Sequence, residues 1–310
     1  MKKEHTRSIT VLFILILSPI ILLNFNLERK ATFSLILLIS LFLIFNKELL
    51  KDLKFSEYKY QSFKLKNLVY FLIIFSTLAI TQNQYLHIET IDWDIASYLV
   101  ASQEIGKGFL PNETQWESKG PLFFYMYYFI TLFTGKNFVL FKLVNDFLLF
   151  FLAVIIFLIV YIKSKNNATK SFFASLFFVL LMSQAWAISG YSEIYSLLFI
   201  SSAYLLLIKF NSSNLNYLSI GLLLSFSTLV NQGTILIAIP FLIYVFRESL
   251  KDSNYKLTLF MILGMVFPHL IFLIIYFLND LLTVYLATYV QIPLGYTEAT
   301  YASFYELKIF

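Results

Sequence analysis

Residues 138–162 read FVLFKLVNDFLLFFLAVIIFLIVYI, a long apolar run between two polar segments of the chain. A helix that crosses the ~30 Å hydrocarbon core of a bilayer needs about 20 predominantly apolar residues. This run meets that length, and the chain shows none of the strand-like alternation expected of a membrane barrel. We therefore expect residues 138–162 to form a membrane-spanning helix.

The composition of the whole chain indicates the same class of protein. Of the 310 residues, 59% are hydrophobic and 13% are charged, whereas an ordinary soluble domain carries about 25% charged residues. The net charge of +5 then reports on loop orientation rather than on nucleic acid, for which the chain carries no motif. Cysteine is absent, which excludes disulfides, thiolate metal sites and a cysteine nucleophile.

The other apolar segments predict an all-α, polytopic bundle of about 9–10 transmembrane helices. The basic start and the apolar run after it are interpreted as a retained first span rather than a cleaved signal peptide. Residues 217–246 fit either two short helices or one long broken helix. The expected spans are 9–25, 31–46, 68–85, 138–162, 171–189, 194–209, 217–230, 234–246 and 257–278.

Orientation follows from lysine and arginine, which mark the cytoplasmic loops. They are concentrated at the start of the chain, in residues 47–66 and in the loop 163–170. We therefore place these segments in the cytoplasm and the acidic segment 86–121 outside. The polar residues beside the spans then share the outer face; they are Asp92, Asp94, Lys119, Glu193, Asn231, Gln232 and Tyr296.

The short apolar segment 121–134 leaves two topologies open. If it lies in the interface or re-enters, its aromatic side chains sit at the lipid headgroups and the loop 163–170 is cytoplasmic. If it is a full short span, that loop lies outside. We prefer the first topology, because the lysines of the loop then obey the positive-inside rule.

Asp92 and Asp94 open the acidic segment. Residues with i, i+3 and i+4 spacing follow, which predicts an amphipathic helix on the outer surface; they are Ile95, Tyr98, Leu99, Ser102 and Ile105. A carboxylate at the start of such a helix either caps it as a solvated acid or acts as a general base or cation ligand. The pattern alone favours the cap.

A second motif, Glu117-Ser-Lys-Gly-Pro-Leu122, ends the segment. Pro121 fits the first position of a helix, so Lys119 lies at a helix N-terminus, where anions bind. It is either part of a phosphate site or a lysine that reaches from the interface to water. Further along, Glu193 lies between two apolar runs, and Asn231 with Gln232 interrupts another. These three side chains either bind a polar ligand or cap helices.

In order along the chain, these motifs resemble the GT-C membrane glycosyltransferases, closest to the protein mannosyltransferase, aminoarabinose transferase and Rgt-like group. DIASY, Asp94 to Tyr98, matches the acid and A-x-Y motif of the first outer loop, and KGPL, Lys119 to Leu122, matches a later signature. The resemblance covers about residues 68–250. The adjacent second acid of the family motif is missing, since Ile95 follows Asp94, and Asp92 is expected to take its place.

The resemblance implies a fold, a reaction and a division of the chain. Residues 1–67 would form two N-terminal helices and a basic loop, and residues 68–310 a GT-C-like module with the outer loop 86–121, incomplete at its C-terminus. The implied activity is inverting transfer of a hexose or pentose from a polyprenyl-phosphate donor to a glycan, lipid or protein acceptor. It would take place at the extracytoplasmic face of a bacterial-type cytoplasmic membrane.

The roles implied by the resemblance fall on named residues. Asp94 is expected to be the catalytic base with Asp92 beside it, and Lys119 is expected to bind the donor phosphate. The residues expected to bind or orient substrate are Tyr98, Glu117, Glu193, Asn231 and Gln232. No cofactor is certain, and a divalent cation is allowed but not required. Two other functions stay open: a transporter or flippase of a lipid-linked or small polar solute, and a non-catalytic membrane subunit.

Overall fold

The computed structural model describes residues 65–83, 92–115, 117–182, 189–209, 213–251 and 253–295. Throughout these segments the chain forms helices joined by turns, with no strand, so the predicted all-α class is confirmed for this part of the protein. The expected spans 9–25 and 31–46, and the predicted outer residue Tyr296, lie outside the described residues.

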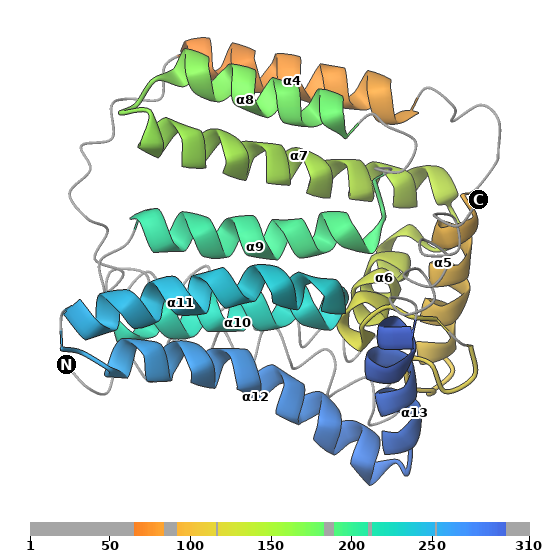
Figure 1. The fold of residues 1–310 in the computed structure, drawn as a ribbon. Helices are drawn as coiled ribbons and strands as arrows, with labels where there is room; N and C mark the ends of the chain where they lie inside the picture. The colour runs from red at the N-terminus through yellow and green to blue at the C-terminus, as the bar shows by residue number, and fades with distance from the viewer. Residues whose placement is uncertain are drawn as a thin grey trace, which may run out of the picture.

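In the described segments, seven helices lie side by side and form a bundle (Figure 1). They are α4 (Leu65–Asn83), α7 (Phe138–Lys163), α8 (Ala168–Leu181), α9 (Ser192–Lys209), α10 (Asn214–Val230), α11 (Ile235–Lys251) and α12 (Lys256–Leu278). In the described part of the chain, α7, α9, α11 with the turn before it, and α12 are long and apolar enough to cross a membrane. These helices indicate a membrane protein, and its described part is entirely helical apart from turns.

The segment 217–246 forms two helices rather than one. Asn231 ends α10, and its side chain accepts a hydrogen bond from the backbone N–H of Gly233 at 3.1 Å. A 3₁₀ turn, η2 (Gln232–Thr234), then leads into α11. The first of the two alternatives from the sequence is therefore confirmed, and the break places Asn231 and Gln232 at one end of the bundle.

Close contact between α10 and α12 depends on two glycines. A Cβ on Gly221 would lie 2.1 Å from the carbonyl oxygen of Met261, and a Cβ on Gly264 would lie 2.3 Å from that of Leu218. Small residues allow helix backbones to approach in this way where lipid provides no hydrophobic drive for association. This contact holds α10 against α12, and the last turn of α10 contributes to the candidate site.

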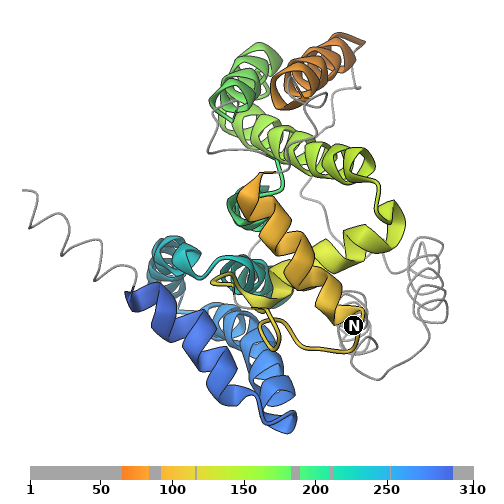
Figure 2. The same cartoon turned by 90° about the vertical axis from the view of Figure 1, so that its right-hand side faces the viewer.

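Three further helices lie across the end of the bundle where α7 and α9 begin and where α10 and α12 end (Figures 1 and 2). They are α5 (Trp93–Ile105), α6 (Pro121–Thr134) and α13 (Leu282–Leu286). We call this end the capped end. Lys163, Lys209 and Lys251 occupy the last turns of α7, α9 and α11, away from it. That separation of charge agrees with the predicted orientation, which stays a prediction.

The position of α6 agrees with one expectation from the sequence and corrects another. The helix lies across the capped end instead of running along the bundle (Figure 1), in agreement with the preferred topology, which stays a prediction. Its aromatic side chains do not face outward to headgroups, however, because α5 covers the helix and α10 packs against it. They are buried in the largest core cluster; they include Phe123, Phe124, Tyr125, Tyr127 and Tyr128.

Candidate functional site

The segment before α6 is fixed against the end of α10. The backbone N–H of Gly120 donates to the carbonyl oxygen of Val230 at 3.0 Å. Gly120 lies so close to Leu229 that a Cβ would come within 1.9 Å of the Leu229 carbonyl oxygen. In addition, the Gln232 side chain donates from Nε2 to the carbonyl oxygen of Ser118 at 2.5 Å. These contacts set the position of Lys119, which lies between Ser118 and Gly120.

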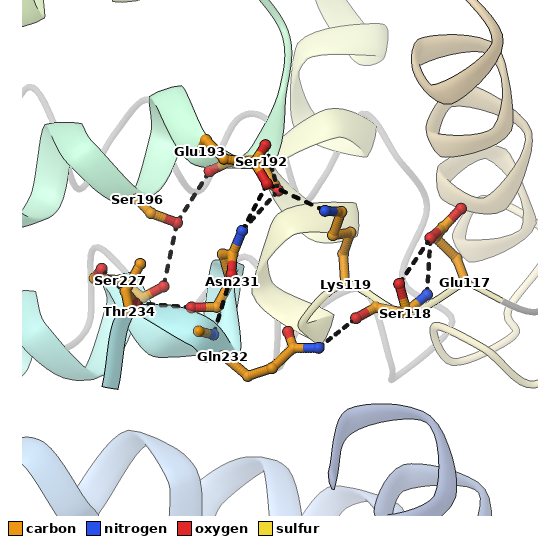
Figure 3. Close-up of polar contacts among 11 residues, drawn as sticks. Glu117, Ser118, Lys119, Ser192, Glu193, Ser196, Ser227, Asn231, Gln232 and Thr234 are labelled. Atoms are coloured by element: carbon orange, nitrogen blue, oxygen red, sulfur yellow. Dashed lines mark hydrogen bonds and ion pairs between the residues drawn. The ribbon is translucent and has the colours of Figure 1, made fainter. Parts of the chain in front are cut away.

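Lys119 and Asn231 meet on one carboxylate oxygen of Glu193 (Figure 3). The distance from Lys119 Nζ to Glu193 Oε1 is 3.2 Å, and the distance from Asn231 Nδ2 to the same oxygen is 2.9 Å. Ser192 Oγ donates to the second oxygen, Oε2, at 3.1 Å. The Glu193 side chain is 54% exposed and that of Lys119 is 21% exposed, so solvent reaches the ion pair. Residues from three elements thus converge at the capped end.

Asp92 and Asp94 have different positions on α5. Asp92 is the N-cap, and its Oδ1 accepts the backbone N–H groups of Asp94 at 3.0 Å and Ile95 at 3.2 Å. Tyr191 lies near Asp92, and burial and the Asp92 carboxylate raise the pKa of the Tyr191 hydroxyl. Asp94 lies in the first turn and is exposed. Asp92 is therefore occupied in holding the helix start, while Asp94 faces solvent.

Electrostatics distinguish Asp94 further. Partial burial raises the pKa of the Asp94 carboxyl above its ordinary value, and the negative charges of Asp92, Glu117 and Glu193 raise it as well. The positive charge of Lys119 acts in the opposite direction and lowers the pKa. A raised pKa makes a carboxylate more basic, which suits a general base. The same interactions show that the charges of Lys119 and Glu193 act on Asp94.

Tyr191 is linked to the same group. Burial, the Asp92 carboxylate and the other nearby carboxylates raise the pKa of the Tyr191 hydroxyl above its ordinary value. The hydroxyl therefore stays protonated near neutral pH. The effect of Asp92 on Tyr191 places the turn before α9 near the start of α5.

Glu117 connects α5 to the segment that leads into α6. Its Oε2 accepts a hydrogen bond from Ser97 Oγ at 3.0 Å, and its Oε1 accepts the backbone N–H of Ser118 at 2.8 Å. The backbone N–H of Glu117 itself donates to Asn112 Oδ1 at 3.1 Å. Glu117 is thus placed to position the segment that carries Lys119.

Tyr98 lies beneath the site rather than on its surface. Its side chain is 2% exposed, and its ring packs edge-on against Phe123 and Tyr127 at centroid distances of 4.9 and 5.9 Å. Ile95, Ser102 and Ile105 are buried on the same face of α5, as the predicted amphipathic spacing requires. Tyr98 therefore anchors α5 on α6, and its predicted role toward substrate stays a prediction.

The structure brings the predicted polar residues together and adds others that the sequence did not single out. Tyr191 and Ser192 precede Glu193, and Ser97 lies one turn after Asp94. Serine and tyrosine are common throughout this chain, so no local signal separates these residues from the rest. Across the described segments, no group of three or more His, Asp or Glu side chains is arranged to hold a metal ion.

Comparison with known proteins adds no family assignment. The chain matches no protein-family model, no curated protein and no solved structure. The resemblance to GT-C glycosyltransferases therefore depends on the motifs quoted above, and the arrangement at the capped end has to be judged on its own chemistry.

Proposed function

We propose that the chain is an inverting glycosyltransferase that uses a polyprenyl-phosphate-linked sugar at the outer face of a bacterial-type cytoplasmic membrane. The observation that carries the proposal is the arrangement of Lys119, Glu193 and Asp94. A lysine at the start of α6 is paired with a carboxylate, and an exposed acid with a raised pKa lies within reach of both charges. An anionic leaving group needs a cation of this kind, and an attacking hydroxyl needs a base of this kind.

The Lys119–Glu193 contact indicates how a donor phosphate would bind. Lys119 and Asn231 both donate to a single oxygen of Glu193, which is partly exposed. An oxygen of a phosphate group accepts the same donors with the same geometry, so it can replace the Glu193 carboxylate on Lys119 and Asn231. The N-terminus of α6, a 14-residue helix, adds its positive dipole end beside Lys119. Glu193 then becomes free to accept hydrogen bonds from sugar hydroxyls.

The reaction balances with these groups. The acceptor hydroxyl oxygen forms a bond to the anomeric carbon, and its proton passes to the carboxylate of Asp94. The bond between the anomeric carbon and the phosphate oxygen breaks, and its electron pair leaves with the phosphate, where Lys119 stabilises the charge. Attack from the face opposite the leaving group inverts the anomeric carbon. Asp92 serves this step by holding the first turn of α5, on which Asp94 lies.

The surrounding apolar surface suits a lipid-linked donor. Large hydrophobic side chains on α11 and α12 are exposed, as expected for helices that face lipid; they include Leu236, Ile243, Leu263, Ile274 and Phe277. A polyprenyl tail would share this environment, and the bilayer would keep its phosphate near the capped end. The acceptor, a glycan, lipid or envelope protein, would reach Asp94 from the aqueous side.

The direct test is transfer from a panel of radiolabelled polyprenyl-phosphate sugars by membranes that contain the chain. We expect one donor to be active and Lys119→Ala to weaken donor binding about 10- to 100-fold, because a charge-assisted contact to phosphate contributes about 1.5–3 kcal/mol. Lys107→Ala is the matched control, since Lys107 pairs with Glu104 at the far end of α5. Unchanged donor affinity in Lys119→Ala would remove the phosphate site.

The raised pKa of Asp94 predicts the pH dependence of transfer. The base works only when deprotonated, so kcat/KM should rise with pH through the pKa of Asp94, which lies above the ordinary carboxyl value. Glu117→Gln removes a negative charge that raises this pKa, and so the acidic limb of the profile should move to lower pH. The measurement is kcat/KM for the unaltered chain and for Glu117→Gln, from about pH 4, near the ordinary carboxyl pKa, to about pH 8. A shift to higher pH would contradict the assignment.

A transporter or flippase is the second candidate, and one observation favours it. Lys142 and Asp146 in α7 form an ion pair of 3.2 Å with both side chains buried. Charged residues inside membrane helices often mark a transport pathway. This candidate predicts solute or lipid movement across proteoliposomes that depends on Asp146, with no covalent transfer of sugar. A transported product found without transfer would replace the glycosyltransferase proposal.

A further inference from the structure

The Lys142–Asp146 ion pair hydrogen-bonds to a third group, Ser189. Lys142 Nζ donates to Ser189 Oγ at 2.5 Å, and Ser189 Oγ donates to Asp146 Oδ1 at 2.5 Å. Ser189 is 1% exposed, and the two charged residues are 8% and 3% exposed. The three side chains therefore contact one another in the interior, on the first turns of α7 and the turn before α9.

The turn that contains Ser189 is held from several helices at once. The Ser189 backbone N–H donates to Gln82 Oε1 of α4 at 3.0 Å. The hydroxyl of Tyr127 in α6 donates to the carbonyl oxygen of Gly190. Gly190 has a φ of +113°, and a Cβ there would lie 3.3 Å from Ile95 Cδ1 of α5. Its conformation requires glycine, and its surroundings leave the turn little freedom.

The next residues of this turn enter the candidate site. Tyr191 lies near Asp92 at the start of α5, and Glu193 pairs with Lys119 before α6. The Ser189–Gly190 turn is thus the link between the interior of the bundle and both halves of the site. A small displacement of this turn would move Tyr191 and Glu193 relative to Asp94 and Lys119.

Stability alone gives little reason for a buried ion pair. Replacing such a pair by apolar side chains of similar volume is often neutral or stabilising, because the cost of desolvating two charges offsets their attraction. An ion pair that also hydrogen-bonds to a serine does fix the orientation of the turn, because its hydrogen bonds allow only one arrangement. Loss of that arrangement would change the geometry of the candidate site even if the bundle stayed folded.

We propose that Lys142 and Asp146, acting through Ser189, are positioning residues that set Tyr191 and Glu193 in the site. The inference that this matters for sugar transfer rests on the proposed function, whereas the placement of Glu193 against Lys119 does not. The chain contains no cysteine, so cysteines introduced at two positions report on that placement without interference.

The experiment cross-links Lys119→Cys to Glu193→Cys with a short bis-maleimide in membranes, and adds Ser189→Ala. We expect the cross-link yield to fall several-fold, and transfer by Ser189→Ala in the otherwise unaltered chain to fall about 10- to 100-fold, since a misplacement of about 1 Å is enough for that loss. Ser175→Ala is the matched control: Ser175 is also fully buried and donates at 2.9 Å to Ala153 of α7, but it does not contact the turn.

Each outcome decides the proposal. A cross-link yield that falls with Ser189→Ala and is unchanged with Ser175→Ala supports the positioning role. The double variant Lys142→Met with Asp146→Leu should lower the cross-link yield in the same way without lowering the thermal midpoint of unfolding. An unchanged yield with Ser189→Ala overturns the proposal, and so does an equal fall with both serine variants, which would indicate general loosening. If the yield falls as expected but the unaltered chain transfers no sugar, the positioning holds and the proposed function fails.

Discussion

Asp94→Asn is expected to reduce sugar transfer by about 10²- to 10⁴-fold, the range that general base catalysis contributes. The amide has the size and nearly the shape of the carboxylate, but it cannot accept the proton of the attacking hydroxyl. Asp94 is exposed in the first turn of α5, and the cap of this helix comes from Asp92. The substitution should therefore leave the helix and the expression level as they are. The measurement is single-turnover transfer with the active donor at saturating concentration.

Glu104→Gln is the matched control for Asp94→Asn. Glu104 is an acid on the same helix, but its carboxylate pairs with Lys107 at 2.6 Å near the C-terminal end of α5. The same chemical change there should leave transfer within twofold of the unaltered chain, on the order expected for surface positions. Normal transfer by Asp94→Asn would reject Asp94 as the base, and equal loss in both variants would show that α5 tolerates no change of charge.

Local signals predicted much of the fold. Pro121 fits the first helical position, and the structure gives α6 as Pro121–Thr134, the apolar segment 121–134 that the sequence indicated. The spacing of Ile95, Tyr98 and Ser102 predicted which face of α5 would be buried. In each case the deciding interaction lies within one helix or its first turn, so residues close in sequence are sufficient.

The features that the sequence did not predict depend on contacts between residues far apart in the chain. The aromatic residues of α6 satisfy an interfacial pattern, yet they are buried because α5 and α10 pack on them. Likewise, nothing near Glu193 in sequence predicts that its partners would be Lys119, 74 residues away, and Asn231, 38 residues away. Such pairs depend on how helices are stacked, which hydrophobic pattern alone leaves undetermined.

The second large effect is expected from Gly120→Ala. A Cβ at this position would lie 1.9 Å from the carbonyl oxygen and 2.5 Å from the carbonyl carbon of Leu229. These are backbone atoms near the end of α10, so no side chain can move aside to make room. The segment before α6 must then separate from α10, which also breaks the hydrogen bond from Gly120 N–H to the Val230 carbonyl. We expect a loss of about 3 kcal/mol in the free energy of unfolding, the upper range for overpacking.

The same displacement should affect transfer more than stability. Lys119 precedes Gly120, so moving the segment carries the ammonium group away from Asn231 and Glu193, and a shift of about 1 Å is enough to reduce the rate about 100-fold. Gly295→Ala is the control, because a Cβ there meets no atom within 4 Å. Thermal melting in detergent and transfer at a temperature well below the midpoint separate the two effects. Full transfer by folded Gly120→Ala would show that the contact with α10 does not place Lys119, and the phosphate site would then have to be sought elsewhere on the capped end.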